Sequence, residues 1–271
     1  MKKMWVLTRD RLFSPSLPPF QLLAMSPLKP LFILLALSPS LAADPGFGWK
    51  FDRGYKYLWI TKGEKVGETV FRFSRKEGAA GAPEYYQLVS RRKMESSGRI
   101  QDSSTTMIFA KDGSPSSYQE ETRIRLSSEK KFASLQEVTI RFDKGKVTTT
   151  FVNNGNKEGA SKKETTVGKD TFLFSTLCQE QWNLFTRKLD SKGPTSLETF
   201  YPEFGVVMKI DFRPEVASAP LKIGNKEIPV TRFSFEAKKW KWTGNIWVDS
   251  RGRMLKYTSG PLTIVLTGKI D

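Results

Sequence analysis

The feature that most limits the fold of this chain is a repeated alternation of apolar and polar residues in short runs. In residues 138–142 and 206–212 the apolar side chains fall at every second position. A period of two is typical of a β-strand that buries one face. Similar runs recur from about residue 55 to the C-terminus, separated by Gly, Asp and Asn. We therefore expect ten to twelve short strands in a mainly β fold, with a single antiparallel, strongly curved sheet or an incomplete β-barrel.

Two hairpins are the clearest local predictions. The first joins residues 55–62 to 66–74 through a Gly-Glu-Lys turn, and the second joins 240–248 to 253–258 through residues 249–252. In the strand 66–74, Thr69, Phe71 and Phe73 share one face. The Gly at the end of the second connection suits the left-handed backbone that such hairpins need. Residues 153–163 are polar and Gly-rich, which predicts a loop.

One segment departs from the strand period. Between residues 170 and 192 the apolar side chains recur at spacings of three and four: Phe174, Cys178, Trp182, Phe185 and Leu189. This stripe predicts one principal α-helix at about 171–190, ended by Gly193 and Pro194.

The N-terminal 42 residues have the features of a leader. Residues 31–37 are apolar, too few to cross a bilayer but long enough for the core of a signal peptide. Small residues at positions 40 and 42 predict cleavage after Ala42, and Met25 is the expected start of translation. The alternative is an uncleaved amphipathic tail or a buried strand. We expect an exported protein, periplasmic or else extracellular, with a single domain at 43–271 and no transmembrane span.

Composition excludes several kinds of chemistry. The chain has no His, and Cys178 is its only Cys, so a Ser-His-Asp triad, a disulfide within the chain and a zinc site are absent. Cys178 lies on the apolar stripe and is expected to be a small buried side chain. Adjacent Glu120 and Glu121 point to opposite faces of a strand, and Asp249 heads a turn. We predict no catalytic residue, no metal and no cofactor.

Basic residues exceed acidic ones, but they are spread along the chain. The formal net charge is +16, and residues 43–271 keep 39 basic and 27 acidic residues, or +12. Residues 238–242 (Lys-Lys-Trp-Lys-Trp) combine cations and aromatics as single-strand nucleic-acid binders do. Strict alternation instead places Trp240 and Trp242 together on one face of a half-buried strand. We expect an anionic membrane surface, and not nucleic acid, as a partner.

Aromatic residues are frequent on the predicted inward faces, where they either fill a core or line a cavity for an apolar ligand. The candidates for such a cavity are Trp59, Phe71, Phe73, Phe142, Phe151, Trp182, Phe212, Phe233, Phe235, Trp240 and Trp242.

Four segments together suggest a family. They are residues 62–68 (Lys-Gly-Glu-Lys-Val-Gly-Glu), the predicted helix, residues 200–205 (Phe-Tyr-Pro-Glu-Phe-Gly) and residues 246–256 (Ile-Trp-Val-Asp-Ser-Arg-Gly-Arg-Met-Leu-Lys). The chain resembles an exported bacterial family of unknown function that is similar to the periplasmic lipoprotein carriers of the LolA/LolB type. The resemblance implies an incomplete antiparallel barrel with a helix at its concave side, and it brings no catalytic motif.

These observations favour a non-enzymatic, monomeric protein that holds a lipid or a lipoprotein acyl chain against a concave face. One alternative is a structural or protein-interaction module of the cell envelope. Another is a carboxylate-dependent enzyme acting on an envelope polymer, which would need two acidic side chains close together in a cleft.

Overall fold

A computed structural model describes residues 48–78, 84–175, 178–215 and 218–267. The chain divides into two units, Met1–Ser40 and Leu41–Asp271, and all of the described residues belong to the second. The predicted leader at 1–42, with its expected start at Met25 and cleavage after Ala42, lies outside the described residues. Within the described residues, no helix is long and apolar enough to cross a bilayer.

The second unit is built around one large sheet. Its first eight strands follow the chain in order: β1 (Gly54–Thr61), β2 (Glu64–Lys76), β3 (Tyr85–Ser96), β4 (Arg99–Phe109), β5 (Pro115–Leu126), β6 (Ser134–Asp143), β7 (Lys146–Asn153) and β8 (Ser161–Thr166). The remaining strands of this sheet are β9 (Phe172–Leu173), β10 (Thr195–Tyr201), β11 (Val206–Pro214), β14 (Val230–Ala237), β15 (Trp242–Asp249), β16 (Met254–Ser259) and β17 (Leu262–Thr267). A separate hairpin pairs β12 (Leu221–Ile223) with β13 (Lys226–Ile228).

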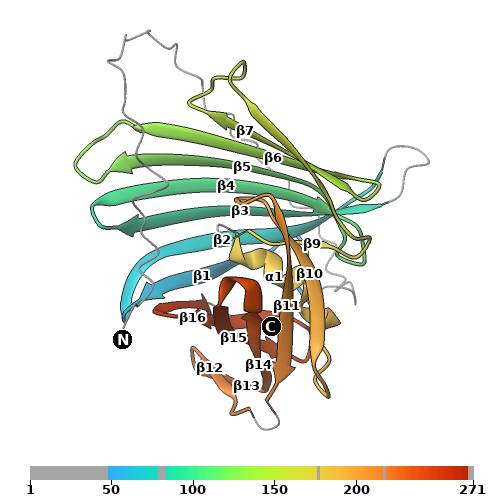
Figure 1. The fold of residues 1–271 in the computed structure, drawn as a ribbon. Coiled ribbons are helices and arrows are strands. Elements are labelled where there is room, and N and C mark those ends of the chain that lie inside the picture. Colours follow the sequence, from blue (N-terminus) through green and yellow to red (C-terminus); the bar gives the residue numbers. More distant parts are fainter. Residues whose placement is uncertain (1–47, 79–83, 176–177, 216–217, 268–271) are drawn as a thin grey trace, which may run out of the picture. The chain divides into compact units, whose positions relative to one another are not determined.

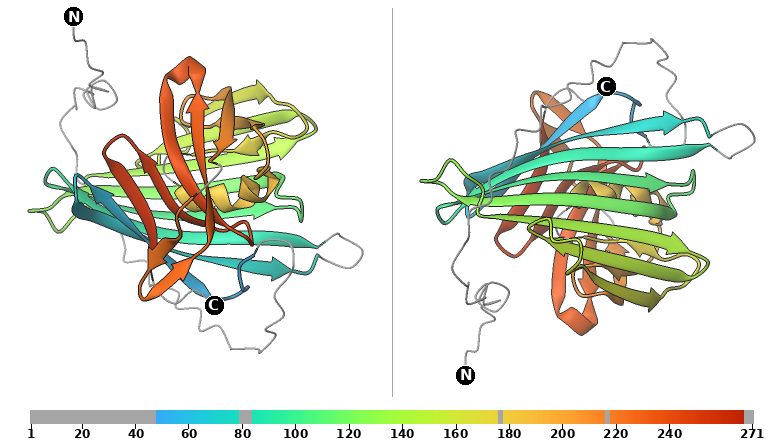
Figure 2. Two further views of the ribbon diagram at one scale, coloured as in Figure 1. Left: turned by 90° about the horizontal axis from the view of Figure 1, so that it is seen from below. Right: turned by 90° about the horizontal axis from the view of Figure 1, so that it is seen from above.

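The large sheet runs β8-β7-β6-β5-β4-β3-β2-β1-β17-β16-β15-β14-β11-β10-β9 and has two free edges, so it is not a closed barrel. All of its pairs are antiparallel except β9 with β10. The sheet curves so that β10, β11 and β14–β16 cross the long strands β2–β7, with the helix α1 (Trp182–Phe185) between them (Figures 1 and 2). The predicted mainly β, strongly curved and incomplete barrel is confirmed.

The curvature has local causes. Strands twist because of their chirality, and bulges increase the twist. The register shifts at three places: Trp59/Ile60, Ile108/Phe109 and Trp247/Val248. At Gly67, a Cβ would lie 2.5 Å from the carbonyl oxygen of Lys93, so only glycine allows β2 and β3 to approach this closely. The curved sheet brings both of its halves onto one aromatic core.

The predicted helix is present but much shorter than 171–190. Helical structure covers only the 3₁₀ turn η2 (Gln179–Gln181), α1 and the 3₁₀ turn η3 (Thr186–Lys188). At its start, Phe172 and Leu173 pair instead with Thr199 and Phe200 of β10. Four of the five side chains of the apolar stripe are buried and Leu189 is half-buried, but strand pairing at the sheet edge replaces the first helical turns.

The strand boundaries hold with two corrections. The predicted strand 240–248 begins at Trp242, because Lys238–Trp240 form the 3₁₀ turn η4 and Lys241 has a left-handed backbone with φ of 50°. The predicted loop 153–163 ends early, since β8 begins at Ser161. Strands β8, β9, β10, β12 and β13 lack a clear alternating pattern and were not predicted, so the described residues hold 17 strands where ten to twelve were expected.

Candidate functional site

The concave face of the sheet changes character along β3, β4 and β5. At one end of these strands, side chains such as Tyr86, Phe109 and Tyr118 are aromatic and buried. Further along, the inward positions that the register aligns become polar while staying buried. We call this set the polar belt: Ser90, Arg92, Ser103, Thr105, Glu120 and Thr122. A buried row of this kind departs from the apolar inward face that the core of a sheet normally presents.

Hydrogen bonds join the polar belt across three strands. Arg92 Nη2 donates to Ser103 Oγ at 3.1 Å, and Ser103 Oγ lies 2.8 Å from Thr122 Oγ1. Thr122 Oγ1 donates to Glu120 Oε1 at 2.8 Å, while the hydroxyl of Tyr118 donates to the other carboxylate oxygen of Glu120. The network thus carries a guanidinium at one end and a carboxylate at the other.

The segment that leads into α1 covers the belt with two more ionisable groups. Cys178 and Glu180 are both buried. Burial raises the pKa of the Glu180 carboxyl, against the hydrogen bond from Ser90 and the charge of Arg92, which lower it. Burial also raises the pKa of the Cys178 thiol, and the charges of Glu180 and Glu120 raise it further. The expectation that Cys178 is buried is confirmed, but its surroundings are polar.

We include Glu180 in the polar belt, because it interacts with Ser90 and Arg92, and the belt then holds two carboxyl groups for one guanidinium. Uncompensated buried charge is costly, and such groups shift their pKa values or recruit partners. Burial, followed by the charge of Glu120, raises the pKa of the Tyr118 hydroxyl, which keeps it a hydrogen-bond donor. Among the described residues, no group of three or more Cys, Asp or Glu side chains is placed to hold a metal ion. The side chains of the belt can take part in hydrogen bonding and in proton transfer.

Beyond the belt, the inward residues of β3–β7 are only half-buried. They mix apolar and amide side chains: Met94, Gln101, Ile124, Gln136, Val138 and Phe151. The register places Val138 between Glu120 of β5 and Phe151 of β7. Gln101 Nε2 reaches Ser103 Oγ at 3.4 Å, which connects this rim to the belt. We call this set the amphipathic rim, because it combines partly exposed apolar surface with hydrogen-bonding groups.

The structure divides the predicted cavity residues into three groups. Seven are buried: Trp59, Phe71, Phe73, Trp182, Phe212, Phe233 and Phe235. Three are half-buried: Phe142, Phe151 and Trp242. Trp240 is 38% exposed on the outside, so its predicted inward position is wrong. The 3₁₀ turn at 238–240 and the left-handed Lys241 break the alternation on which that prediction relied.

Three of the buried candidates, Trp182, Phe212 and Phe235, pack together in the interior at α1. The Trp182 ring lies between 5.1 and 6.0 Å, centroid to centroid, from six other rings: Phe174, Phe185, Phe212, Phe235, Trp242 and Tyr257. Asn183 fastens the helix, since its Nδ2 donates to the Tyr57 hydroxyl at 3.1 Å and its Oδ1 accepts from Met254 N at 2.7 Å. In this half of the sheet, side chains of the protein itself occupy the concave face.

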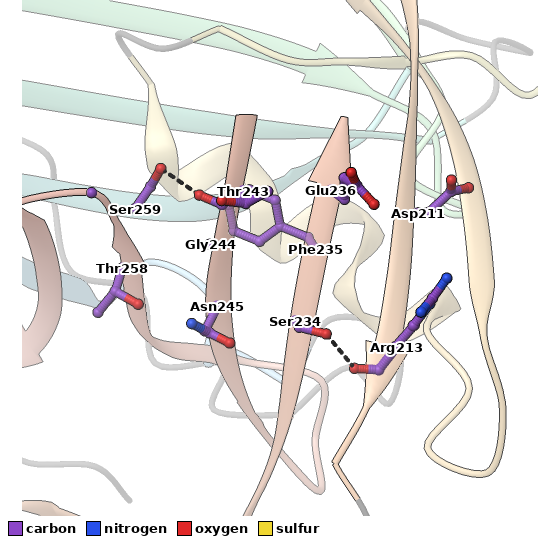
Figure 3. Close-up of a pocket in the computed structure, with 11 residues that line it drawn as sticks. Asp211, Arg213, Ser234, Phe235, Glu236, Thr243, Gly244, Asn245, Thr258 and Ser259 are labelled. Atoms are coloured by element: carbon purple, nitrogen blue, oxygen red, sulfur yellow. Dashed lines mark hydrogen bonds between the residues drawn. The ribbon is translucent and has the colours of Figure 1, made fainter. Parts of the chain in front are cut away.

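The outer surface also has a hollow of about 580 Å³ over β11, β14, β15 and β16 (Figure 3). Two of its polar side chains are already engaged, since Ser259 Oγ donates to Thr243 O at 2.8 Å and the Ser196 hydroxyl donates to Asp211. Small residues, among them Ser234 and Gly260, account for the depression. Asp211 lies on the outward face of its strand.

Comparison with known proteins finds similarity only among solved structures. No known family model and no curated protein sequence matches it. It is similar to the crystal structure of a β-barrel-like protein of a domain of unknown function, DUF1849, from Brucella abortus. The two share 12% identity and a TM-score of 0.46, over 79% of this chain and 94% of that one. It is also similar to a DUF1089 family protein from Pseudomonas aeruginosa, with 9% identity and a TM-score of 0.39 over 69% and 89%. Neither supports the expected resemblance to the lipoprotein carriers.

The sequence pointed to Glu120 and Cys178 individually, but it did not indicate that the residues of the polar belt form one connected group. Glu120 and Glu121 do point to opposite faces, as predicted, and Glu120 is the buried one. The signal for the belt was the inward period itself, which continues through Ser90 and Arg92 with polar residues in apolar positions. Glu180 could not be identified from the sequence, because it does not lie on the apolar stripe of the predicted helix.

Proposed function

We propose that this is an exported, non-enzymatic binding protein that holds an amphiphilic molecule, a lipid or an acyl-chain ligand, on the concave face of the half-barrel. The observation that carries the proposal is the buried polar belt next to the amphipathic rim. A core that served stability alone would gain by being apolar, because buried ion pairs seldom add net stability. Buried ionisable groups with shifted pKa values gather at functional sites.

The arrangement suits a ligand with two chemically different ends. The half-buried Val138 and Phe151 offer apolar surface for a hydrocarbon chain, which contributes about 25 cal/mol per Å² of apolar area removed from water. Gln101 and Gln136 on the same face offer amide donors and acceptors for a polar head.

Binding is tested with the full chain and two probes, ANS and a dansyl-labelled undecanoic acid. We expect saturable fluorescence with the wild type and at least tenfold weaker binding for Phe151→Asp, because a carboxylate there opposes an apolar chain. Phe132→Asp is the matched control, since Phe132 is 42% exposed on the outer surface. It should bind within twofold of the wild type.

Two results would overturn the proposal. One is the absence of any lipid in organic extracts of protein purified from its native compartment, together with no binding of either probe. The other is unchanged binding by a folded Phe151→Asp protein, which would move the site away from the rim. Export is tested separately by cell fractionation: deletion of residues 1–42 should keep the protein in the cytoplasm.

A further inference from the structure

Two loops of the sheet bring exposed aromatic rings together on the outer surface. Phe204 lies in the β10–β11 turn, and Trp240 ends η4, which follows β14. The two side chains are 44% and 38% exposed, and their ring centroids are 5.1 Å apart. Tyr201, half-buried, supports them from below with its ring centroid 4.9 Å from that of Phe204. Large apolar side chains gathered at loop tips are uncommon on a surface that meets only water.

Cations surround these rings. Lys238, Lys239 and Lys241 are all exposed on the same short segment as Trp240. From β8, Lys163 extends its Nζ to within 3.2 Å of the carbonyl oxygen of Phe204. We call this set of three rings and four lysines the aromatic–lysine tip.

Three acidic groups lie beside the tip, which carries four lysines. Glu203, next to Phe204, is half-buried and accepts a hydrogen bond from Ser175 Oγ at 2.8 Å. Glu164 lies 3.9 Å from the exposed Lys162 on β8. Glu236 faces the outer hollow of Figure 3. Among the described residues, neither Glu164 nor Glu236 forms an ion pair with a lysine of the tip.

We propose that the aromatic–lysine tip docks the protein onto an anionic phospholipid surface. Tryptophan and phenylalanine partition into the interface between headgroups and acyl chains, while lysines reach the phosphates around them. Clustered basic residues add electrostatic attraction that depends on anionic lipid and on salt. The inference goes beyond the proposed ligand site, since it concerns the outer surface, and neither depends on the other.

The ring geometry favours a lipid surface over nucleic acid. A base-stacking platform presents open ring faces. Here the Tyr201 and Phe204 planes meet at 67° and the Phe204 and Trp240 planes at 41°, so the rings pack on one another as an apolar knob. A knob flanked by cations matches the apolar depth and the negative charge of a membrane interface.

The test measures co-sedimentation of the full chain with vesicles of phosphatidylglycerol and phosphatidylcholine (1:1) and with vesicles of phosphatidylcholine alone. We expect at least tenfold tighter binding to the anionic vesicles, and loss of this preference in 0.5 M salt. Phe204→Ser/Trp240→Ser should weaken binding at least tenfold, and so should Lys238→Gln/Lys239→Gln/Lys241→Gln. Circular dichroism and the melting temperature establish that each variant is folded.

A second loop of the same chain supplies the control. Phe132 is also exposed and follows Lys130 and Lys131, but the guanidinium groups of Arg123 and Arg125 each lie 5.9 Å from its ring centroid. Phe132→Ser/Lys130→Gln/Lys131→Gln should bind within twofold of the wild type. Quenching of tryptophan fluorescence by brominated phosphatidylglycerol should decrease in Trp240→Phe.

Three outcomes would overturn the inference. The first is no binding to either vesicle, and the second is equal loss in the tip variants and the Phe132 control. The third is binding of a single-stranded DNA 20-mer that the tip variants abolish while vesicle binding persists, which would assign the tip to nucleic acid.

Discussion

Two sets of buried charged side chains lie on the same sheet, and they are built differently. At the β15–β16 turn, Asp249 Oδ2 accepts from Nε and Nη2 of Arg253, both at 2.7 Å. Its Oδ1 accepts from the backbone nitrogens of Arg251 and Arg253 at 3.0 and 2.9 Å. One acid meets one base, and local backbone groups use the remaining oxygen. In the polar belt, a single guanidinium faces two carboxyl groups, and the pKa of Glu180 is raised.

The difference is that the Asp249–Arg253 pair stabilises the local fold, whereas the charges of the polar belt are only accommodated by it. The Asp249–Arg253 pair closes a turn and packs against Trp49, over whose ring the Arg253 guanidinium lies at 5.4 Å. The excess acid in the belt does nothing comparable for the backbone. Retaining it costs stability, which is consistent with the ligand-binding role proposed for that face.

The largest effect should come from breaking the closed pair. Asp249→Ala leaves Arg253 buried, 5% exposed, without its counter-charge, and we expect a loss of about 3–5 kcal/mol in the free energy of unfolding by urea. Asp143→Ala is the control, because Asp143 also heads a hairpin turn but is exposed, and its loss should stay below about 0.5 kcal/mol. A loss below about 1 kcal/mol for Asp249→Ala would mean that the pair is not structural.

A substitution in the polar belt should lower the free energy of unfolding by a smaller amount, and this amount should depend on pH. Arg92→Met removes the one guanidinium, but the two carboxyls can then take up protons instead of remaining charged. We expect a loss of about 2 kcal/mol at pH 7 that becomes smaller at pH 5. Arg91→Met is the matched control, since the neighbouring side chain is exposed on the opposite face. An equal loss at both pH values would show that no carboxyl depends on Arg92.

Much of the fold could be predicted from the sequence because alternation records burial directly. The strands with a clear period of two, such as 138–142 and 206–212, lie within β6 and β11. The short strands β9 and β10 could not be predicted, because their pairing is decided by which segments the curved sheet brings together. The helix was too long in the prediction for the same reason: Phe172 and Leu173 lie inside the predicted range 171–190, but they pair with β10 at the edge of the sheet.

The site was harder to predict than the fold. Inward positions are visible in the sequence, so Glu120 could be assigned to one face of its strand. Its nearness to Glu180 depends on how the segment before α1 packs, across 60 residues of chain. The prediction for Trp240 failed for a different reason. Lys241 has a left-handed backbone that breaks the alternation, so the Trp240 side chain lies on the surface and not in the expected interior.

A smaller change in stability is expected when the carboxyl group of Glu180 is removed from the polar belt. Glu180→Gln removes a carboxyl whose pKa is raised by burial. Between the ordinary pKa of about 4.5 and the raised one, the folded state binds more protons than the unfolded state, so this group lowers stability as pH rises. The melting temperature of the variant, relative to the wild type, should therefore increase from pH 4.5 to pH 7. Glu121→Gln, half-buried on the opposite face of the same strand, should show no such trend, and a flat difference for Glu180→Gln would contradict the placement of its carboxyl in the belt.

The smallest effect should come from a charge cluster that is exposed. Glu68 Oε2 lies 2.9 Å from the Nζ of both Lys56 and Lys65, and these hydrogen bonds lower the pKa of Glu68 to about 2. Its contribution is therefore complete above the ordinary pKa of about 4.5 and is lost as pH falls toward 2. Solvent screens exposed pairs, so Glu68→Gln should cost less than about 0.5 kcal/mol at pH 7 and nothing measurable in 1 M salt. The free energy of urea unfolding at the two salt concentrations checks this. A cost as large as that of Arg92→Met would mean that burial does not set the scale of these effects, and the contrast between the turn pair and the polar belt would lose its basis.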